Sequence, residues 1–220
     1  MAAIYLIRHG QASFDAADYD QLSETGYKQA QILGEYWHSL PHPTPEQIYR
    51  GDMLRHQQTL DQFLCNSKKE FPVDIHQGFN EFNHIEVLKR YRQDWSELQG
   101  LKDFEREFFS AFHRWQSGQF DDDYQESWPQ FKQRCITALN DIITRAGTAK
   151  TILVFTSGGT ISVILQHIMQ LSDQQAMRIN QQIRNTSLTR LLFSGSRLSV
   201  DYMNNFSHLE QAGAEWVTYR

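Results

Sequence analysis

The chain has 220 residues, of which 40% are hydrophobic and 21% charged, and its formal net charge at pH 7 is −5. This length suits one domain with an insertion or two small domains, and the composition is typical of a soluble globular protein. The acidic balance disfavours nucleic-acid and anionic-membrane partners, whose phosphates attract basic surfaces.

No stretch has the length of a membrane span, and the first apolar run is too short for a signal peptide. The two cysteines, Cys65 and Cys135, have neither a disulfide-framework nor a zinc spacing, so we expect free thiols. These features together predict a cytoplasmic protein.

The first expected element is a buried strand at residues 4–7, which runs directly into Arg8-His9-Gly10. In open α/β sheets, ligands bind at the carboxyl ends of the strands. Arginine offers phosphate a planar fork of donors, and histidine can act as a neutral nucleophile near pH 7. For the tripeptide alone, a strand end that merely caps the sheet is an equally good interpretation.

A helix is expected next, because Ala30, Leu33 and Trp37 recur at helical spacing and Ser23 or Thr25 can cap its start.

A short strand at 47–50 then leads into a second helix that starts near Gly51, with Asp52 as its candidate N-cap. Arg55 would lie in the first turn, where the positive end of the helix dipole attracts anions. Taken alone, Arg55 is explained more simply as a solvated helix residue.

Another short strand, at 73–75, precedes Glu81, which is flanked by the phenylalanines Phe79 and Phe82. Apolar surroundings disfavour the charged form of a carboxyl group, which suits a general acid. An exposed loop glutamate between two core aromatic residues is the alternative interpretation.

Residues from about 84 to 127 are interpreted as a helical insertion whose aromatic stripe packs on the main body. The stripe keeps helical spacing and consists of Leu101, Phe104, Phe108, Phe112 and Trp115. The run Asp121-Asp122-Asp123 is expected to be a solvated loop, with a divalent-cation site as the alternative.

An amphipathic helix over 131–143 is followed by an unbroken apolar strand at 151–155, the pattern of a central parallel strand. This strand runs into Thr156-Ser157-Gly158-Gly159 and a further helix. A strand, a Gly-rich turn and a helix start together aim backbone N–H groups at an anion. Two more strands are expected at 188–193 and 198–202.

Together these segments resemble the histidine phosphatase superfamily, also called phosphoglycerate-mutase-like. The matching segments, in chain order, are Arg8-His9-Gly10 for the family's Arg-His-Gly signature, Leu22-Ser23 to Gln29-Ala30 for its Leu-Thr/Ser-x-x-Gly-x-x-Gln-Ala segment, Arg55 and Thr59 for its Arg-x-x-x-Thr helix, Glu81 for its proton-donor glutamate, and Asn185-Thr186-Ser187 for its late Asn-x-Ser turn.

Two positions depart from the family pattern. Gly51 stands where a serine is usual, and Ser157 stands where the family has its second active-site histidine. Three of the four side chains of the phosphate pocket are therefore carried over, namely Arg8, His9 and Arg55.

Another histidine could fill the gap left by Ser157. The candidates are His84, three residues after Glu81, and His208 in the tail. An ordinary loop or packing histidine is the simpler interpretation of each.

The resemblance implies an α/β fold, with a mostly parallel central sheet flanked by helices in one domain over residues 1–220. It also implies that His9 attacks phosphorus to give phosphohistidine and that Glu81 transfers the proton. The phosphate group would be held by Arg8, Arg55, Ser157 and Gly158, with Asn185 as an auxiliary residue. No metal ion or other cofactor is expected, because the guanidinium groups supply the positive charge.

The leading function is a phosphomonoesterase, a hydrolase that acts on a small phosphorylated metabolite. Ser157 predicts a weakened enzyme, because loss of one donor in such a pocket costs about 10²–10³ in rate. The alternatives are a phosphoglycerate mutase, which is an isomerase, and a catalytically silent module that binds a phosphate ligand. The oligomeric state, a homodimer included, is left open.

Overall fold

The computed structural model describes residues 1–13, 20–41, 43–67, 69–94, 101–195 and 197–219. The chain divides into two compact units, one made of Met1–Glu81 with Ile136–Arg220 and the other of Phe82–Cys135. The insertion predicted at about 84–127 falls within the second unit, apart from residues 95–100, which lie outside the described part of the chain.

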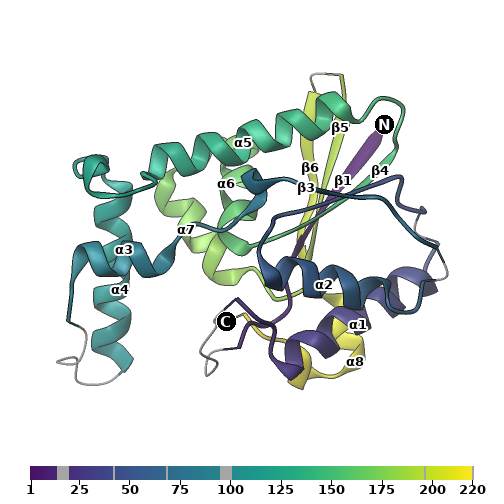
Figure 1. The fold of residues 1–220 in the computed structure, drawn as a ribbon, viewed down its shortest axis with the longest axis horizontal. Coiled ribbons are helices and arrows are strands. Elements are labelled where there is room, and N and C mark those ends of the chain that lie inside the picture. The colour runs from purple at the N-terminus through teal and green to yellow at the C-terminus, as the bar shows by residue number, and fades with distance from the viewer. Residues whose placement is uncertain (14–19, 42, 68, 95–100, 196, 220) are drawn as a thin grey trace. The chain divides into compact units, whose positions relative to one another are not determined.

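The first unit contains a six-stranded sheet with the order β3-β2-β4-β1-β5-β6 (Figure 1). Its strands are β1 (Ala2–Arg8), β2 (Gln47–Arg50), β3 (Val73–Ile75), β4 (Thr151–Thr156), β5 (Leu188–Ser194) and β6 (Arg197–Asn205). Strands β3, β2, β4 and β1 run parallel to their neighbours, whereas β5 and β6 pair antiparallel. This arrangement confirms the predicted α/β fold with a mostly parallel sheet.

Helices cover both faces of this sheet. The helices of the first unit are α1 (Glu24–Ser39), α2 (Leu54–Leu64), α6 (Gly158–Met169), α7 (Asp173–Gln182) and α8 (Ser207–Ala212), with the 3₁₀ helices η1 (Gln77–Phe79) and η3 (Ala214–Trp216). Figure 1 shows α1, α2 and α8 together on one side of the sheet, and α6 with the C-terminal part of α5 (Trp128–Arg145) on the other.

The central strand β1 is apolar on both faces, so helices have to cover both sides of the sheet. Tyr5 and Ile7 belong to the core cluster that includes Trp37 of α1 and Phe63 of α2. The alternate residues of β1 point to the opposite face, and Ile4 and Leu6 are also fully buried there. A strand that is buried on both faces reads as a continuous apolar run, which is how β1 and β4 were predicted.

The second unit contains α3 (His84–Tyr91), α4 (Leu101–Gln116), the 3₁₀ helix η2 (Asp121–Asp123) and the first turns of α5. Its core is aromatic: the ring of Phe82 lies 5.4 Å from that of Phe112, 5.0 Å from that of Trp115 and 5.3 Å from that of Phe131, between centroids. The described part of the predicted stripe thus forms the core of this unit. The side chains of Leu101 and Phe104 lie outside the described set.

Three smaller findings complete the fold. The Asp121-Asp122-Asp123 run forms η2, and Asp123 makes an ion pair with Arg114. Both cysteines are free thiols, as predicted, with Cys65 exposed and Cys135 buried. Among the helices described, none is both long enough and apolar enough to cross a membrane.

Candidate active site

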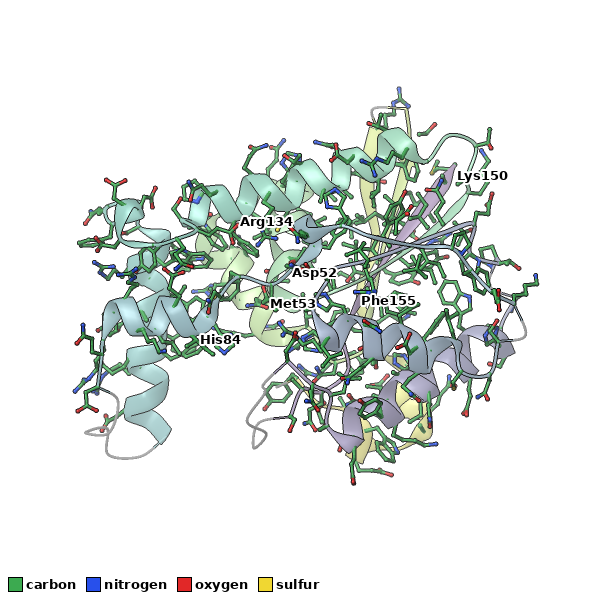
Figure 2. All side chains as sticks on the ribbon, viewed as in Figure 1. Asp52, Met53, His84, Arg134, Lys150 and Phe155 are labelled. Carbon is green, nitrogen blue, oxygen red and sulfur yellow. The ribbon has the colours of Figure 1, made fainter. Side chains whose placement is uncertain are left out.

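The predicted site residues of the first unit gather where the parallel strands end. The backbone N–H of His9, just after β1, donates to the carbonyl of Thr156 at the end of β4 (2.9 Å). The N–H of Gly51, just after β2, donates to the carbonyl of Phe155 (3.1 Å). Figure 2 shows Asp52 and Met53 on the side of Phe155 rather than of Lys150, which precedes β4. The carboxyl ends of β1, β2 and β4 therefore form one site, as open α/β sheets require.

His9 is held in a defined tautomer. Its Nδ1 lies 2.6 Å from the carbonyl oxygen of Gly10, which can only accept, so Nδ1 carries the proton and Nε2 keeps its lone pair. The side chain is 7% exposed. Burial, followed by the positive charges of Arg55 and Arg8, lowers the pKa of His9 well below its usual value. His9 is therefore a neutral imidazole with a free nucleophilic nitrogen near pH 7.

The backbone of His9 is fixed by the turn before β5. The side-chain amide of Asn185 donates to the carbonyl of His9 (3.2 Å), and the N–H of Thr186 donates to the same oxygen (3.3 Å). Thr218 in turn donates to the side-chain oxygen of Asn185 (2.8 Å). Asn185 thus supports the main chain of the predicted nucleophile.

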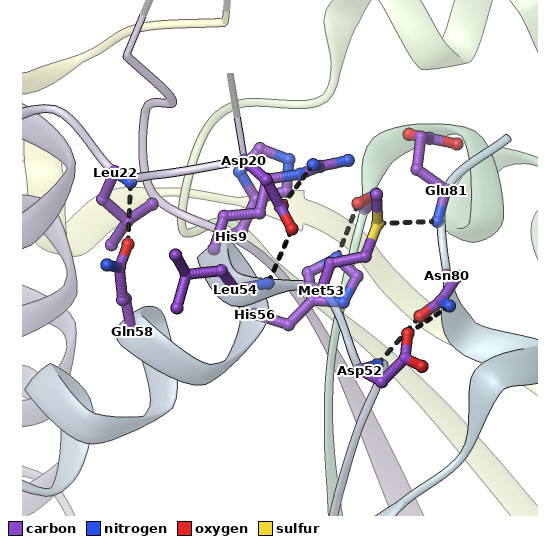
Figure 3. A network of polar contacts seen from close by, with 12 residues as sticks. His9, Asp20, Leu22, Asp52, Met53, Leu54, His56, Gln58, Asn80 and Glu81 are labelled. Carbon is purple, nitrogen blue, oxygen red and sulfur yellow. Dashed lines mark hydrogen bonds and ion pairs between the residues drawn. The ribbon is translucent and has the colours of Figure 1, made fainter. Parts of the chain in front are cut away.

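Arg55 lies in the first turn of α2, as predicted, and is 4% exposed. Its Nη1 pairs with one carboxylate oxygen of Asp20 at 2.6 Å, and the other oxygen accepts from the N–H of Leu54 at 2.8 Å (Figure 3). Thr59, one turn later, accepts from the N–H of Gly10 (3.1 Å) and donates to the carbonyl of Arg55 (2.7 Å). The start of α2 therefore binds an anion, and here that anion is the carboxylate of Asp20.

The prediction that Asp52 caps α2 is wrong. The N-cap residue is Met53, which makes no side-chain cap bond. The carboxylate of Asp52 instead accepts from the side chains of Asn80 and Gln77, and its N–H donates to Asn80 Oδ1 at 2.9 Å. Asp52 is used to hold the loop that leads to Glu81, and Asp20 provides the acceptor for the start of α2 instead.

Arg8 ends β1 beside the start of α6. Its guanidinium donates to the carbonyls of Ile183 and Tyr219. A Cβ added at Gly158 would lie 3.5 Å from Arg8 Nε and 2.6 Å from the side-chain oxygen of Asn180. Glycine at this position therefore leaves room for the side chain of Asn180, and Arg8 lies beside the N-terminus of α6. The guanidinium group and the positive end of the helix dipole are thus close together.

The carboxylate of Glu81 is hydrogen-bonded to the N-terminus of α6. The N–H of Gly159 donates to its carboxylate at 2.9 Å. Two threonines hold the preceding loop, because Thr156 donates to the carbonyl of Phe79 (2.6 Å) and Thr160 to the carbonyl of Asn80 (3.0 Å). Glu81 is only partly buried, so water can reach its carboxylate while the N–H of Gly159 holds it at the site.

Ser157 has a partner that the sequence interpretation missed. Its Oγ lies 2.7 Å from Nε2 of His56, and both residues are fully buried. The ring of His56 lies 5.8 Å from that of His9 between centroids. Burial, followed by the positive charges of Arg55 and Arg50, lowers the pKa of His56 well below its usual value. A second imidazole is thus present beside the position where the family pattern has its histidine, but it comes from α2.

The sequence did contain a signal for this arrangement. A Cβ added at Gly51 would lie 2.4 Å from Nδ1 of His56, so the imidazole uses the space that the usual serine would fill. The two departures from the family pattern, at Gly51 and Ser157, therefore lie on the two sides of His56.

Of the two histidines proposed to fill the gap, His208 has another partner. His208 is buried in α8, where its Nε2 lies 2.9 Å from Thr186 Oγ1 and its ring packs near Tyr36. His84 begins α3 in the second compact unit. The imidazole beside Ser157 is that of His56.

Within the described residues, no group of three or more His, Cys, Asp or Glu side chains is arranged to hold a metal ion. The positive charge at the site comes from Arg8, Arg55 and the N-terminus of α6.

Comparison with known proteins gives a family match and several structures of similar fold. The family model described as histidine phosphatase superfamily (branch 1) matches residues 4–206. No curated protein sequence gives a match.

Solved structures share the fold at low sequence identity. Bacillus stearothermophilus YhfR has a TM-score of 0.70 at 18% identity, over 94% of this chain and 99% of the other. Phosphoserine phosphatase from Entamoeba histolytica has a TM-score of 0.68 at 19% identity, over 95% and 100%. Phosphoglycerate mutase from Bacillus anthracis has a TM-score of 0.67 at 16% identity, over 94% and 94%.

Proposed function

Because this chain belongs to the histidine phosphatase superfamily, we propose that it is a phosphomonoesterase that works through a phosphohistidine on His9. The observation that carries the proposal is the tautomer of His9, which leaves Nε2 unprotonated on a buried ring that the positive charges of Arg55 and Arg8 also act on. The substrate class is a small phosphate ester, and phosphatases of phosphoserine and of glucosyl-3-phosphoglycerate are among the proteins of similar fold.

In the first step, the lone pair of His9 Nε2 attacks phosphorus and the bond to the leaving oxygen breaks. Glu81, carrying a proton, gives it to that oxygen, so that a neutral alcohol departs. Arg8 and Arg55 stabilise the negative charge on the other phosphoryl oxygens. Asp20 occupies Nη1 of Arg55, so its carboxylate would compete with the incoming phosphate for that donor.

In the second step, Glu81 as a carboxylate takes a proton from a water molecule, whose oxygen attacks phosphorus. The phosphorus–nitrogen bond breaks, and His9 and orthophosphate are released. The same glutamate thus acts as an acid and then as a base, which returns the site to its starting state.

The test is hydrolysis of an aryl phosphate by the native protein and by His9→Ala. We expect the substitution to lower kcat by at least about 10³-fold, because it removes the nucleophile. His167→Ala is the matched control, since His167 is exposed on α6 and its loss leaves the site intact. Acid-labile phosphate bound to the native protein but not to His9→Ala would identify the intermediate.

Phosphate release by the native protein no faster than by His9→Ala would overturn the proposal. Isothermal calorimetry with orthophosphate would then identify a silent binding module, and conversion between phosphoglycerates would identify a mutase.

A further inference from the structure

A buried hydrogen-bonded pair, His56 and Ser157, joins the first turns of α2 to the start of α6. Both side chains are fully buried, and the Nε2–Oγ distance is 2.7 Å. Ser157 is the N-cap residue of α6, but its hydroxyl makes no cap bond to that helix. The Ser157 hydroxyl is therefore hydrogen-bonded to His56, whereas an N-cap serine usually accepts from a backbone N–H in the first turn of its helix.

The surroundings of His56 indicate which of its nitrogens carries the proton. Nδ1 is buried against Gly51 and has no hydrogen-bond partner among the described residues. A neutral imidazole has one N–H, and a buried N–H without a partner is costly. The proton therefore belongs on Nε2, where it is donated to Ser157 Oγ.

With its oxygen accepting from His56, Ser157 keeps its own O–H to donate elsewhere. The two residues that follow Ser157 both lie next to residues of the candidate site. Gly158 lies against Arg8, and the N–H of Gly159 binds the carboxylate of Glu81. Ser157 directly precedes these two residues at the N-terminus of α6, and the ring of its partner His56 lies 5.8 Å from that of His9 between centroids.

We propose that His56 and Ser157 form a hydrogen-bond relay, in which His56 Nε2–H orients the Ser157 hydroxyl and that hydroxyl donates to a phosphoryl oxygen of the substrate. Ser157 would contact the phosphate, and His56 would be a positioning residue. The inference rests on the proposed phosphomonoesterase function and deepens it, because it assigns the donor that stands in for the absent second histidine.

The kinetic test compares native protein, Ser157→Ala, His56→Leu, His56→Gln and the double variant His56→Leu/Ser157→Ala on an aryl phosphate. We expect Ser157→Ala to lower kcat/KM by about 10²-fold, because the lost donor binds a phosphoryl oxygen of the bound substrate and binds it more strongly as charge develops in the transition state. His56→Leu should lower kcat by about 10-fold, and the double variant should match Ser157→Ala alone, because two members of one relay are not additive.

His56→Gln is the matched control for packing. The glutamine amide can present an N–H near the position of imidazole Nε2, so this variant should keep most of the turnover that His56→Leu loses. Equal losses in His56→Gln and His56→Leu, with effects that add to that of Ser157→Ala, would show that His56 only fills space and would overturn the relay.

Two further measurements separate the relay from the phosphatase proposal. The ¹⁵N chemical shifts of the His56 ring should report the Nε2–H tautomer in the native protein, and an Nδ1–H tautomer would overturn the relay whatever the activity. Orthophosphate affinity should fall in Ser157→Ala and in His56→Leu but not in His56→Gln. If the native protein lacks turnover yet meets both expectations, the phosphatase proposal fails and the relay stands.

Discussion

His9 acquires its chemistry from three neighbours rather than from its own side chain. The carbonyl of Gly10 holds the proton on Nδ1, and burial, together with the charges of Arg55 and Arg8, opposes a second proton. Because both effects act on the same ring, the nucleophilic form is present without a general base to generate it. The carboxylate of Asp20 balances part of this positive charge while no phosphate is bound.

Replacing Ser157 with histidine tests how the second imidazole is accommodated. The Oγ of Ser157 is already 2.7 Å from His56 Nε2, so a larger side chain meets the ring of His56. We expect Ser157→His to lose about 1–3 kcal/mol of stability through overpacking and to gain no turnover. The double variant His56→Ala/Ser157→His frees the space that the new imidazole needs. We expect it to be more stable than Ser157→His and to have a higher kcat.

The measurements are the free energy of unfolding in urea and kcat on an aryl phosphate, with Ser157→Ala as the control for loss of the hydroxyl. Greater activity in the single histidine variant than in the double variant would contradict this account.

At the scale of elements, the site depends on how closely α1 and α2 pack. A Cβ added at Gly34 of α1 would lie 2.3 Å from the carbonyl oxygen of Phe63 in α2. The two helices therefore touch through their backbones, at the other end of α2 from Arg55 and His56.

We expect Gly34→Ala to destabilise the protein by about 1–3 kcal/mol, because the methyl group overpacks against backbone that cannot yield. In an open helix position the same change would stabilise by about 0.5–1 kcal/mol. Urea denaturation measures the effect, and Glu35→Ala on the exposed neighbouring position is the control. A Gly34→Ala variant at least as stable as the native protein would rule out the close contact.

At the scale of the whole molecule, three buried histidines link stability to pH. Burial lowers the pKa of His208 to about 4, and the pKa values of His9 and His56 are also lowered. The unfolded chain then binds more protons than the folded one below about pH 6.5, so the free energy of unfolding falls as the pH falls.

We expect His208 alone to account for about 2 kcal/mol of the stability lost between pH 7.5 and pH 5. His208→Gln can keep the bond to Thr186 without titrating, so its loss over this range should be smaller by about that amount. Urea denaturation of both proteins at the two pH values provides the comparison. If the native protein and His208→Gln show the same pH dependence, the pKa of His208 does not differ between the folded and the unfolded chain, which would contradict the prediction.

Much of the architecture could be predicted because its causes are local. Apolar runs with β-favouring side chains predicted β1 and β4, and the glycines after them predicted the turns that carry His9 and Ser157. Helix α7 was missed because its sequence is polar and buries only Ala176, so it lacks an apolar stripe. Its start does carry a capping box, formed by Ser172 and Gln175, which is a local signal.

The sequence by itself therefore determined the strands, their glycine turns and the residues that end them, because each depends on neighbours within a few positions. Only the tertiary structure decided the partners of the polar side chains. Ser157 meets His56 across 101 positions of the chain, Arg55 meets Asp20 across 35, and Asp52 meets Asn80 across 28. Such pairs form only when the sheet brings its strand ends together, and no local pattern specifies which donor will meet which acceptor.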